Sequence, residues 1–315
     1  MKNINVDKSN YIDRNTNVFV VNDNAKVIAS GNEESPAYVY AQSNNAEVVC
    51  FEEGAQIYGD SSEIVYDNPS EFNPATGSKF VTFGEGTIIC PGNKSVNCAL
   101  GDSSIMFVGY EFIDEQILES DNGSYEGYKF LENSVCFASG NNANIETLPR
   151  EHCVRNVKMI ITGDRSTIDD YSPSSDNTII STGESNRIDS WGGKEVIATG
   201  NKAFITLDND SSINDEDKIV EKQTVVCLGK ESRIHTKFES TVIIQEEFEW
   251  VRVSKNSTLA ILTKIDNRPD ILLFYTENDE GKYPDNIKEN QKIEPLQYYR
   301  LNNNKELEVV KNPNH

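Results

Sequence analysis

Short apolar runs rich in β-branched residues recur along this chain, and corners made of Gly, Asn, Asp and Ser separate them. Runs of this length and composition, bounded by turn residues, predict strand, corner, strand. The spacing does not match the 3.6-residue period of an amphipathic helix. The pattern therefore predicts an all-β protein.

The apolar runs belong to a repeat in which Ile stands five residues after Gly. The clear copies are Val135-Cys136 with Gly140 and Ile145, Ile160-Ile161 with Gly163 and Ile168, Ile179-Ile180 with Gly183 and Ile188, Val196-Ile197 with Gly200 and Ile205, and Val225-Val226 with Gly229 and Ile234. Their glycines are 23, 20, 17 and 29 residues apart, a spacing close to that of solenoid coils.

One coil of this size buries almost nothing alone, so the repeat requires stacked neighbours. Stacking at the strand spacing of roughly 4.8 Å pairs every backbone and aligns the Ile and Val residues as interior ladders. We expect Gly and Asn to form the corners because they tolerate positive φ. The predicted fold is a single-stranded parallel β-solenoid, or β-helix, with irregular coils of about 20 residues.

The domain organisation follows from where the repeat is regular. Residues 18–245 are predicted to form the solenoid, with residues 1–17 as an N-terminal cap. Insertions are expected near 67–78, which contains Pro69, Pro74 and Gly77, and near 107–131. The glycine corners stop after residue 245, so residues 246–315 are predicted to form a C-terminal β cap or small β module.

Over residues 18–245 the ladder pattern resembles the irregular β-solenoid repeats of many bacterial and phage proteins. Each of three better-defined repeat classes differs from this sequence or depends on a feature that the sequence does not show. Left-handed acyltransferase helices repeat an aliphatic residue every six positions, whereas Ile161 and Ile168 are seven apart. The calcium-binding β-roll needs repeated Gly-Gly-x-Gly-x-Asp, and the single Gly-Gly pair is followed by Lys194. Pectate-lyase-like helices fit the architecture, but an Asp and Arg cluster assembled in space carries their activity.

The chain has 51 acidic and 29 basic residues, a formal charge of −22. Phosphate backbones and anionic membranes repel such a polyanion, so nucleic acid and membrane are excluded as expected partners and a basic protein is favoured. The sequence shows no signal-peptide pattern, which predicts a cytoplasmic protein and leaves non-classical export open. Its six cysteines form no C-x-x-C pair and are predicted to be reduced interior residues.

Motifs for catalysis and for metals are weak. The acidic run Asp208 to Asp217 resembles a calcium loop, but Ile213 and Ile219 occupy positions where an EF-hand needs Gly and Glu. His235 follows a repeat Ile and should point outward, where it could act as a base only beside a groove. We therefore predict no metal, no cofactor and no catalytic residues.

The candidate binding residues are the carboxylates of the densest acidic segment and two tryptophans that could offer a flat platform. They are Asp208, Asp210, Asp215, Glu216, Asp217, Trp191 and Trp250. For Trp250, packing within the C-terminal module is the alternative interpretation.

The predicted function is that of a non-enzymatic acidic interaction protein that binds a basic protein partner, as an inhibitor or immunity-type decoy would. Two alternatives stay open: a structural, surface or phage-particle component, and a polysaccharide-active β-helix enzyme. The sequence does not determine the oligomeric state or the handedness of the solenoid.

Overall fold

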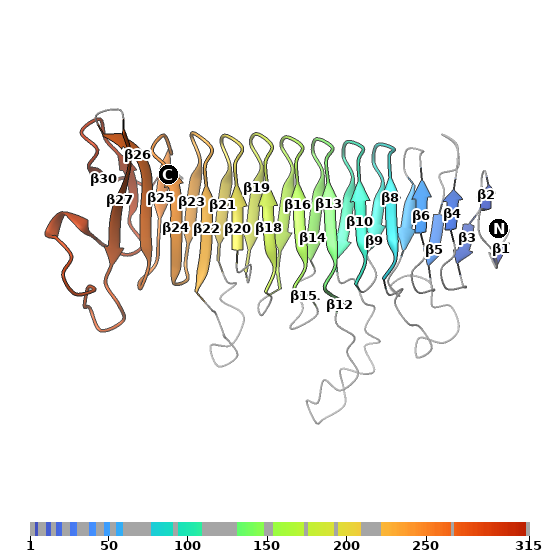
Figure 1. Cartoon of the computed structure of the whole chain (residues 1–315), viewed down its shortest axis with the longest axis horizontal. Coiled ribbons are helices and arrows are strands. Elements are labelled where there is room, and N and C mark those ends of the chain that lie inside the picture. Colours follow the sequence, from blue (N-terminus) through green and yellow to red (C-terminus); the bar gives the residue numbers. More distant parts are fainter. Residues whose placement is uncertain are drawn as a thin grey trace, which may run out of the picture. The chain divides into compact units, whose positions relative to one another are not determined.

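A computed structural model gives the architecture of the chain (Figure 1). It describes residues 4–5, 11–13, 17–20, 26–29, 38–41, 47–50, 55–58, 77–90, 94–108, 131–147, 154–172, 176–191, 195–208, 222–265 and 268–312. The chain divides into two compact units, residues 1–160 and 161–315, and we describe each by itself.

The first unit contains two sheets, which we call A and B, and consecutive strands alternate between them. Sheet A has the order β1 (Ile4–Asn5), β3 (Asn17–Val20), β5 (Tyr38–Ala41), β7 (Gln56–Tyr58), β9 (Ile88–Cys90), β11 (Ile105–Val108) and β14 (Asn144–Thr147). Sheet B has the order β2 (Tyr11–Asp13), β4 (Lys26–Ala29), β6 (Glu47–Cys50), β8 (Lys79–Thr82), β10 (Val96–Ala99), β13 (Val135–Ala138) and β16 (Lys158–Ile161), whose last residue begins the second unit. A small extra sheet pairs β12 (Leu131–Glu132) with β15 (Val154–Arg155).

The second unit repeats this alternation. Its sheet A has the order β17 (Thr167–Asp170), β19 (Arg187–Ser190), β21 (Phe204–Leu207), β23 (Arg233–Thr236), β25 (Trp250–Arg252), β29 (Tyr298–Leu301) and β30 (Leu307–Val310). Its sheet B has the order β18 (Thr178–Ser181), β20 (Glu195–Ala198), β22 (Gln223–Cys227), β24 (Ser240–Gln245), β26 (Thr258–Ile265), β27 (Arg268–Thr276) and β28 (Lys292–Ile293). One 3₁₀ helix, η3 (Glu289–Gln291), precedes β28.

The strands of each coil pair in parallel and in register with the next coil, which confirms the prediction of an all-β parallel solenoid. Parallel pairing continues through β23–β25 and β24–β26, beyond the predicted start of a C-terminal module at residue 246. It becomes antiparallel where β27 pairs with β26 and β29 pairs with β25. These antiparallel strands cover the last coil and form the C-terminal cap.

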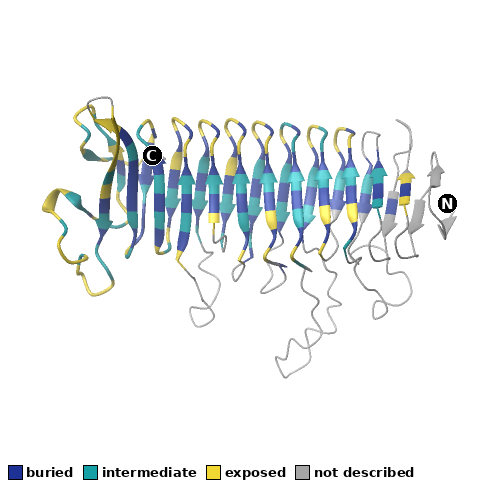
Figure 2. Ribbon diagram, in the orientation of Figure 1, coloured by how far each residue is buried: buried dark blue, intermediate teal, exposed yellow. Residues whose placement is uncertain are grey.

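Residues alternate between the interior and the surface along each strand (Figure 2). The repeat isoleucines of the sequence lie in sheet A and point inward. Ile145, Ile168, Ile188, Ile205 and Ile234 are each no more than 1% exposed. In the second unit these isoleucines lie directly beside one another in adjoining coils: Ile168 beside Ile188, Ile188 beside Ile205 and Ile205 beside Ile234. Interior ladders of this kind are what make a coil depend on its neighbours.

The repeat glycines lie at the corners, as predicted, but not for the predicted reason. A Cβ on Gly200 would lie 1.8 Å from the carbonyl oxygen of Gly183, and a Cβ on Gly229 would lie 1.8 Å from that of Gly200. Gly140 meets Gly101 in the same way at 2.0 Å. Glycine is therefore required at these corners because consecutive coils approach too closely for a side chain. Positive φ is not the reason.

Positive φ occurs two residues after each repeat glycine, on residues of mixed type. These are Asn142, Arg165, Ser185, Lys202 and Glu231, with φ between 54° and 59°. In the second unit the N–H groups of these residues donate to corner carbonyls of the next coil, for example Ser185 to Asn201 at 2.8 Å and Lys202 to Lys230 at 2.7 Å. These backbone bonds, which lie outside the strands, stabilise an αL conformation that non-glycine residues rarely adopt.

The two connections of each coil differ in length. The B-to-A connection is a tight corner, such as residues 182–186 between β18 and β19. The A-to-B connections vary from residues 237–239 to the long segment 59–78, and residues 109–130 lead from β11 to β12 of the small extra sheet. Most of the predicted 67–78 and 107–131 insertions, and of the predicted 1–17 cap, lie outside the described residues. Within the described part of the chain, no helix has the length and apolar character needed to cross a membrane.

Candidate functional site

The outward side of sheet A in the second unit, which we call the A face, gathers charged and aromatic side chains. Its first row is Thr167, Arg187, Phe204, Arg233 and Trp250; its middle row is Asp169, Asp189, Thr206, His235 and Arg252; its third row is Tyr171, Trp191, Asp208 and Lys237. The register of adjoining strands brings these residues together, although neighbours in a row are about one coil apart in sequence.

Arg252 lies at the centre of a cluster near the end of this face. Its Nε donates to the carbonyl of Leu296 at 2.8 Å, and its Nη1 lies 3.3 Å from Nε2 of His235. Its guanidinium also lies 5.0 Å from the centroid of the Tyr298 ring. Because Leu296 and Tyr298 belong to the C-terminal cap, the contacts of Arg252 attach the cap to the last coils.

His235 is a poor general base in this setting. Burial, and then the positive charge of Arg252, lower its pKa to about 4. The imidazole is therefore neutral at pH 7, and its Nε2 accepts the Arg252 hydrogen bond. A base of such low pKa has little tendency to take a proton from a substrate.

The two candidate tryptophans lie in different environments. Trp250 is 3% exposed and packs edge-on against Phe204 and Tyr298, with ring centroids 6.1 and 5.1 Å apart. This packing holds the Trp250 ring between the last coils and Tyr298 of the cap, in line with the packing alternative, and a binding role of Trp250 stays a prediction. Trp191 is half-buried and meets the ring of Tyr171 edge-on at 5.0 Å, so part of its surface remains accessible.

The predicted acidic segment begins at the A face. Asp208 follows β21 and its Oδ2 pairs with Nζ of Lys237 at 2.5 Å. The remaining predicted carboxylates, Asp210, Asp215, Glu216 and Asp217, lie outside the described residues. The described residues contain no group of three or more His, Cys, Asp or Glu side chains that could hold a metal ion.

Two carboxylates that sequence reasoning did not single out lie side by side in the middle row. Asp169 and Asp189 occupy directly opposed positions of β17 and β19. Nη2 of Arg187 lies 3.0 Å from Oδ2 of Asp189. Asp169 and Asp189 each come directly after a repeat Ile, as His235 does. Because residues alternate between the two sides of a strand, the position after an inward Ile points outward, and this rule could have identified both carboxylates from the sequence.

A third carboxylate, Asp170, points into the coil and is fully buried. Nδ2 of Asn177 lies 3.2 Å from both of its oxygens, and the Ser190 hydroxyl lies 3.4 Å from Oδ2. The backbone N–H of Ser172 donates to Oδ1 at 3.3 Å. These donors solvate the carboxylate inside the protein, which is how a buried acidic group is tolerated.

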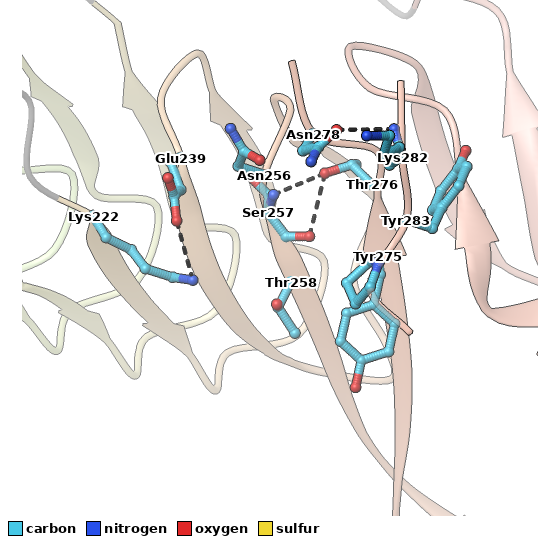
Figure 3. Close-up of a pocket in the computed structure, with 11 residues that line it drawn as sticks. Lys222, Glu239, Asn256, Ser257, Thr258, Tyr275, Thr276, Asn278, Lys282 and Tyr283 are labelled. Atoms are coloured by element: carbon cyan, nitrogen blue, oxygen red, sulfur yellow. Dashed lines mark hydrogen bonds and ion pairs between the residues drawn. The ribbon is translucent and has the colours of Figure 1, made fainter. Parts of the chain in front are cut away.

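A pocket of about 310 Å³ lies at the start of strands β22, β24 and β26, next to β27 (Figure 3). Lys222 and Glu239 form an ion pair on one side of it, with Nζ and Oε1 3.4 Å apart, and Tyr275 and Tyr283 line the other side. Burial raises the pKa of Tyr283, so its hydroxyl stays protonated at neutral pH. The pocket offers hydrogen-bonding groups without an assembled nucleophile and base.

Comparison of the chain with protein-family models, with curated proteins and with solved structures found no match.

Proposed function

We propose that this protein is a non-enzymatic interaction protein that binds a basic protein partner through the acidic connections between sheets A and B. The observation that carries the proposal is the position of the net charge along the chain. Residues 59–76, 109–130 and 209–221 hold 15 acidic and 2 basic residues, a net charge of −13 out of −22.

All three segments follow a strand of sheet A. Residues 59–76 lead from β7 to β8 and residues 209–221 from β21 to β22, both in sheet B, whereas residues 109–130 lead from β11 to β12 of the small extra sheet, before β13 of sheet B. Because the strands within a sheet are parallel, such connections leave every coil of a unit from the same edge of sheet A. Within the first unit, residues 59–76 and 109–130 therefore leave from one edge, where their charge concentrates negative potential, which favours a basic partner and speeds its association.

The charges on the described strands and corners are largely paired with one another. On the A face, Arg187 pairs with Asp189, Lys237 with Asp208 and Arg233 with Glu249. At the corners, Lys202 pairs with Glu184 and Lys230 with Glu247. Exposed pairs of this kind add little stability, but they compensate part of the charge on the strands and corners. The three connections therefore carry the larger part of the unbalanced charge, −13, and the rest of the chain carries −9.

The test is capture from a lysate of the source cell by immobilised protein, with quantitative mass spectrometry at low and high salt. We expect one or more basic proteins that are lost at high salt. A variant with Asp210→Asn, Asp215→Asn, Glu216→Gln and Asp217→Asn should lose them. A control variant with Asp270→Asn, Asp279→Asn, Asp285→Asn and Glu289→Gln removes the same charge from the cap and should retain them. Equal loss of the captured basic proteins in both variants, or capture that does not depend on the salt concentration, would contradict the proposal.

The side-by-side carboxylates favour a second candidate function, action on a polysaccharide. Glycosidases use two carboxyl groups about 5 to 10 Å apart, and Asp169 and Asp189 lie on neighbouring strands beside the rings of Tyr171 and Trp191. Release of reducing ends from a glycan by the wild-type protein, and its loss in Asp189→Asn, would support this candidate.

A further inference from the structure

The outward side of sheet B in the second unit, which we call the B face, differs in chemistry from the A face. Its first row is Thr178, Glu195, Thr224, Thr241, Thr258 and Tyr275; its middle row is Ile180, Ile197, Val226, Ile243, Ala260 and Leu273; its third row is Thr182, Thr199, Leu228, Gln245, Leu262 and Ile271. Glu195 is the single charged residue in these three rows.

The apolar side chains of the B face are not covered by other described residues of the chain. Ile271 is 55% exposed, Leu228 is 39% exposed and Leu273 is 37% exposed. Ile180, Ile197, Val226 and Ile243 are each partly exposed, although they lie in the middle of the sheet. A contiguous apolar row of this kind on the surface of a protein marks an interaction site.

The fold does not require this composition. β-branched residues suit strands, which accounts for part of the pattern. The A face, however, is built on the same coils and carries Asp, Arg, His and Trp at its outward positions. Outward positions of these coils therefore tolerate charge, and an almost uncharged face is a feature that stability of the solenoid does not explain.

We propose that the B face is a self-association surface that pairs with the B face of a second copy of this chain. The net charge limits where two copies can meet. Each copy carries −22, so contact through most of the surface brings like charges together. The B face avoids that repulsion. A twofold axis that lies in the plane of the contact and runs along the middle row places the middle aliphatic row of one copy on that of the other, and such self-complementarity is what an isologous interface requires.

The size of the B face predicts a dimer of moderate affinity. Six strands at about 4.8 Å and five residues at about 3.3 Å give a planar footprint of roughly 480 Å² per copy, before side-chain relief is counted. Specific interfaces begin at about 600 Å² per partner. We therefore expect dissociation in the micromolar range. This inference is independent of the basic partner proposed above.

The test is sedimentation velocity of the full chain over a concentration series from about 1 to 200 μM, which spans the expected range of affinity. We expect a monomer–dimer equilibrium that strengthens with salt, because salt screens the repulsion between two acidic copies. Binding of a basic partner should weaken with salt, so the two proposals give opposite responses and can fail separately.

Variants place the contact on the B face. Val226→Lys should weaken the dimer at least about tenfold, because each copy then contributes one lysine to the centre of an apolar interface and both ammonium groups lose their hydration. The double variant Ile197→Thr with Ile243→Thr keeps β-branched side chains in the strands and should also weaken the dimer. Thr206→Lys adds the same charge to the A face and should leave it unchanged.

Circular dichroism confirms that each variant is folded, and the double variant keeps the test valid if Val226→Lys does not fold. A wild-type protein that stays monomeric at every concentration would overturn the proposal. Equal effects of Val226→Lys and Thr206→Lys would overturn it too, as would B-face variants that abolish lysate capture while leaving self-association intact.

Discussion

Replacing Gly200 with alanine tests whether close contact between coils, rather than backbone conformation, requires glycine at the corners. The new Cβ would lie 1.8 Å from the oxygen and 2.5 Å from the carbonyl carbon of Gly183, and 2.8 Å from the oxygen of Thr182. Carbon atoms rarely approach a neighbouring heavy atom within 3.0 Å, so the corner must open by about 1.2 Å.

That opening stretches two backbone bonds between these coils, Ser185 N–H to Asn201 at 2.8 Å and Thr199 N–H to Ser181 at 2.9 Å. Each net hydrogen bond contributes about 1 kcal/mol, and overpacking typically costs about 1 to 3 kcal/mol. We therefore expect Gly200→Ala to lower the free energy of unfolding by about 3 to 5 kcal/mol. Urea denaturation followed by circular dichroism measures this change, and amide hydrogen exchange at Ser185 and Lys202 localises it.

The matched control is Gly281→Ala in the cap of the same unit. Gly281 has φ of +73°, and its nearest atom is Oε2 of Glu277 at 3.9 Å, so alanine there meets open space. The cost is only the strain of an L-residue in the left-handed region, about 1 to 2 kcal/mol. If Gly281→Ala proves more destabilising than Gly200→Ala, the steric explanation of the glycine corners is refuted.

Two further predictions concern titratable groups of the second unit. The pKa of His235 is about 4 in the folded chain, where Arg252, Asp208 and Lys237 surround it, and near 6.5 when unfolded. The unfolded chain therefore binds a proton that the folded chain does not between these values, and stability falls as pH falls from 6.5 to 4. His235→Gln should make the loss of unfolding free energy between pH 6.5 and 4 smaller by about 1 to 2 kcal/mol, a value that is reduced for solvent screening. Urea titrations at several pH values measure this change, and a pH profile equal to that of the wild type would contradict the assignment of the loss to His235. Asp170→Ala should cost about 2 to 4 kcal/mol in the same assay, because Asn177 and Ser190 lose their buried acceptor. The outward Asp189→Ala should cost under about 1 kcal/mol, and similar costs for the two would contradict the buried role of Asp170.

The interior of the coils could be predicted from the sequence, whereas the surfaces could not. An Ile five residues after Gly fixes both the corner and the inward register, so Ile188 and Ile205 were placed correctly. The reason for the glycine was missed because its contact is with a glycine 17 to 39 residues away. The αL corner positions were missed because Asn, Arg, Ser, Lys and Glu all occupy them.

The A face was missed for a related reason. Asp189, His235 and Arg252 share no residue type, and they become neighbours only once the register of the strands is known. The change to antiparallel pairing at β27, by contrast, has a local signal: only residues 266 and 267 separate β26 from β27, and so short a connection joins antiparallel strands. Patterns along one chain report the face of a strand but not its partner.

The tight corners mean that this protein can gain or lose residues within its coils only as whole coils. The coil from Gly183 to Gly200 comprises 17 residues, and deleting or duplicating it would leave every inward residue at an equivalent inward position. A change of any other size within a strand would reverse or displace its faces. Evolution and protein engineering can therefore lengthen this protein by copying a coil, while single-residue insertions are confined to the A-to-B connections.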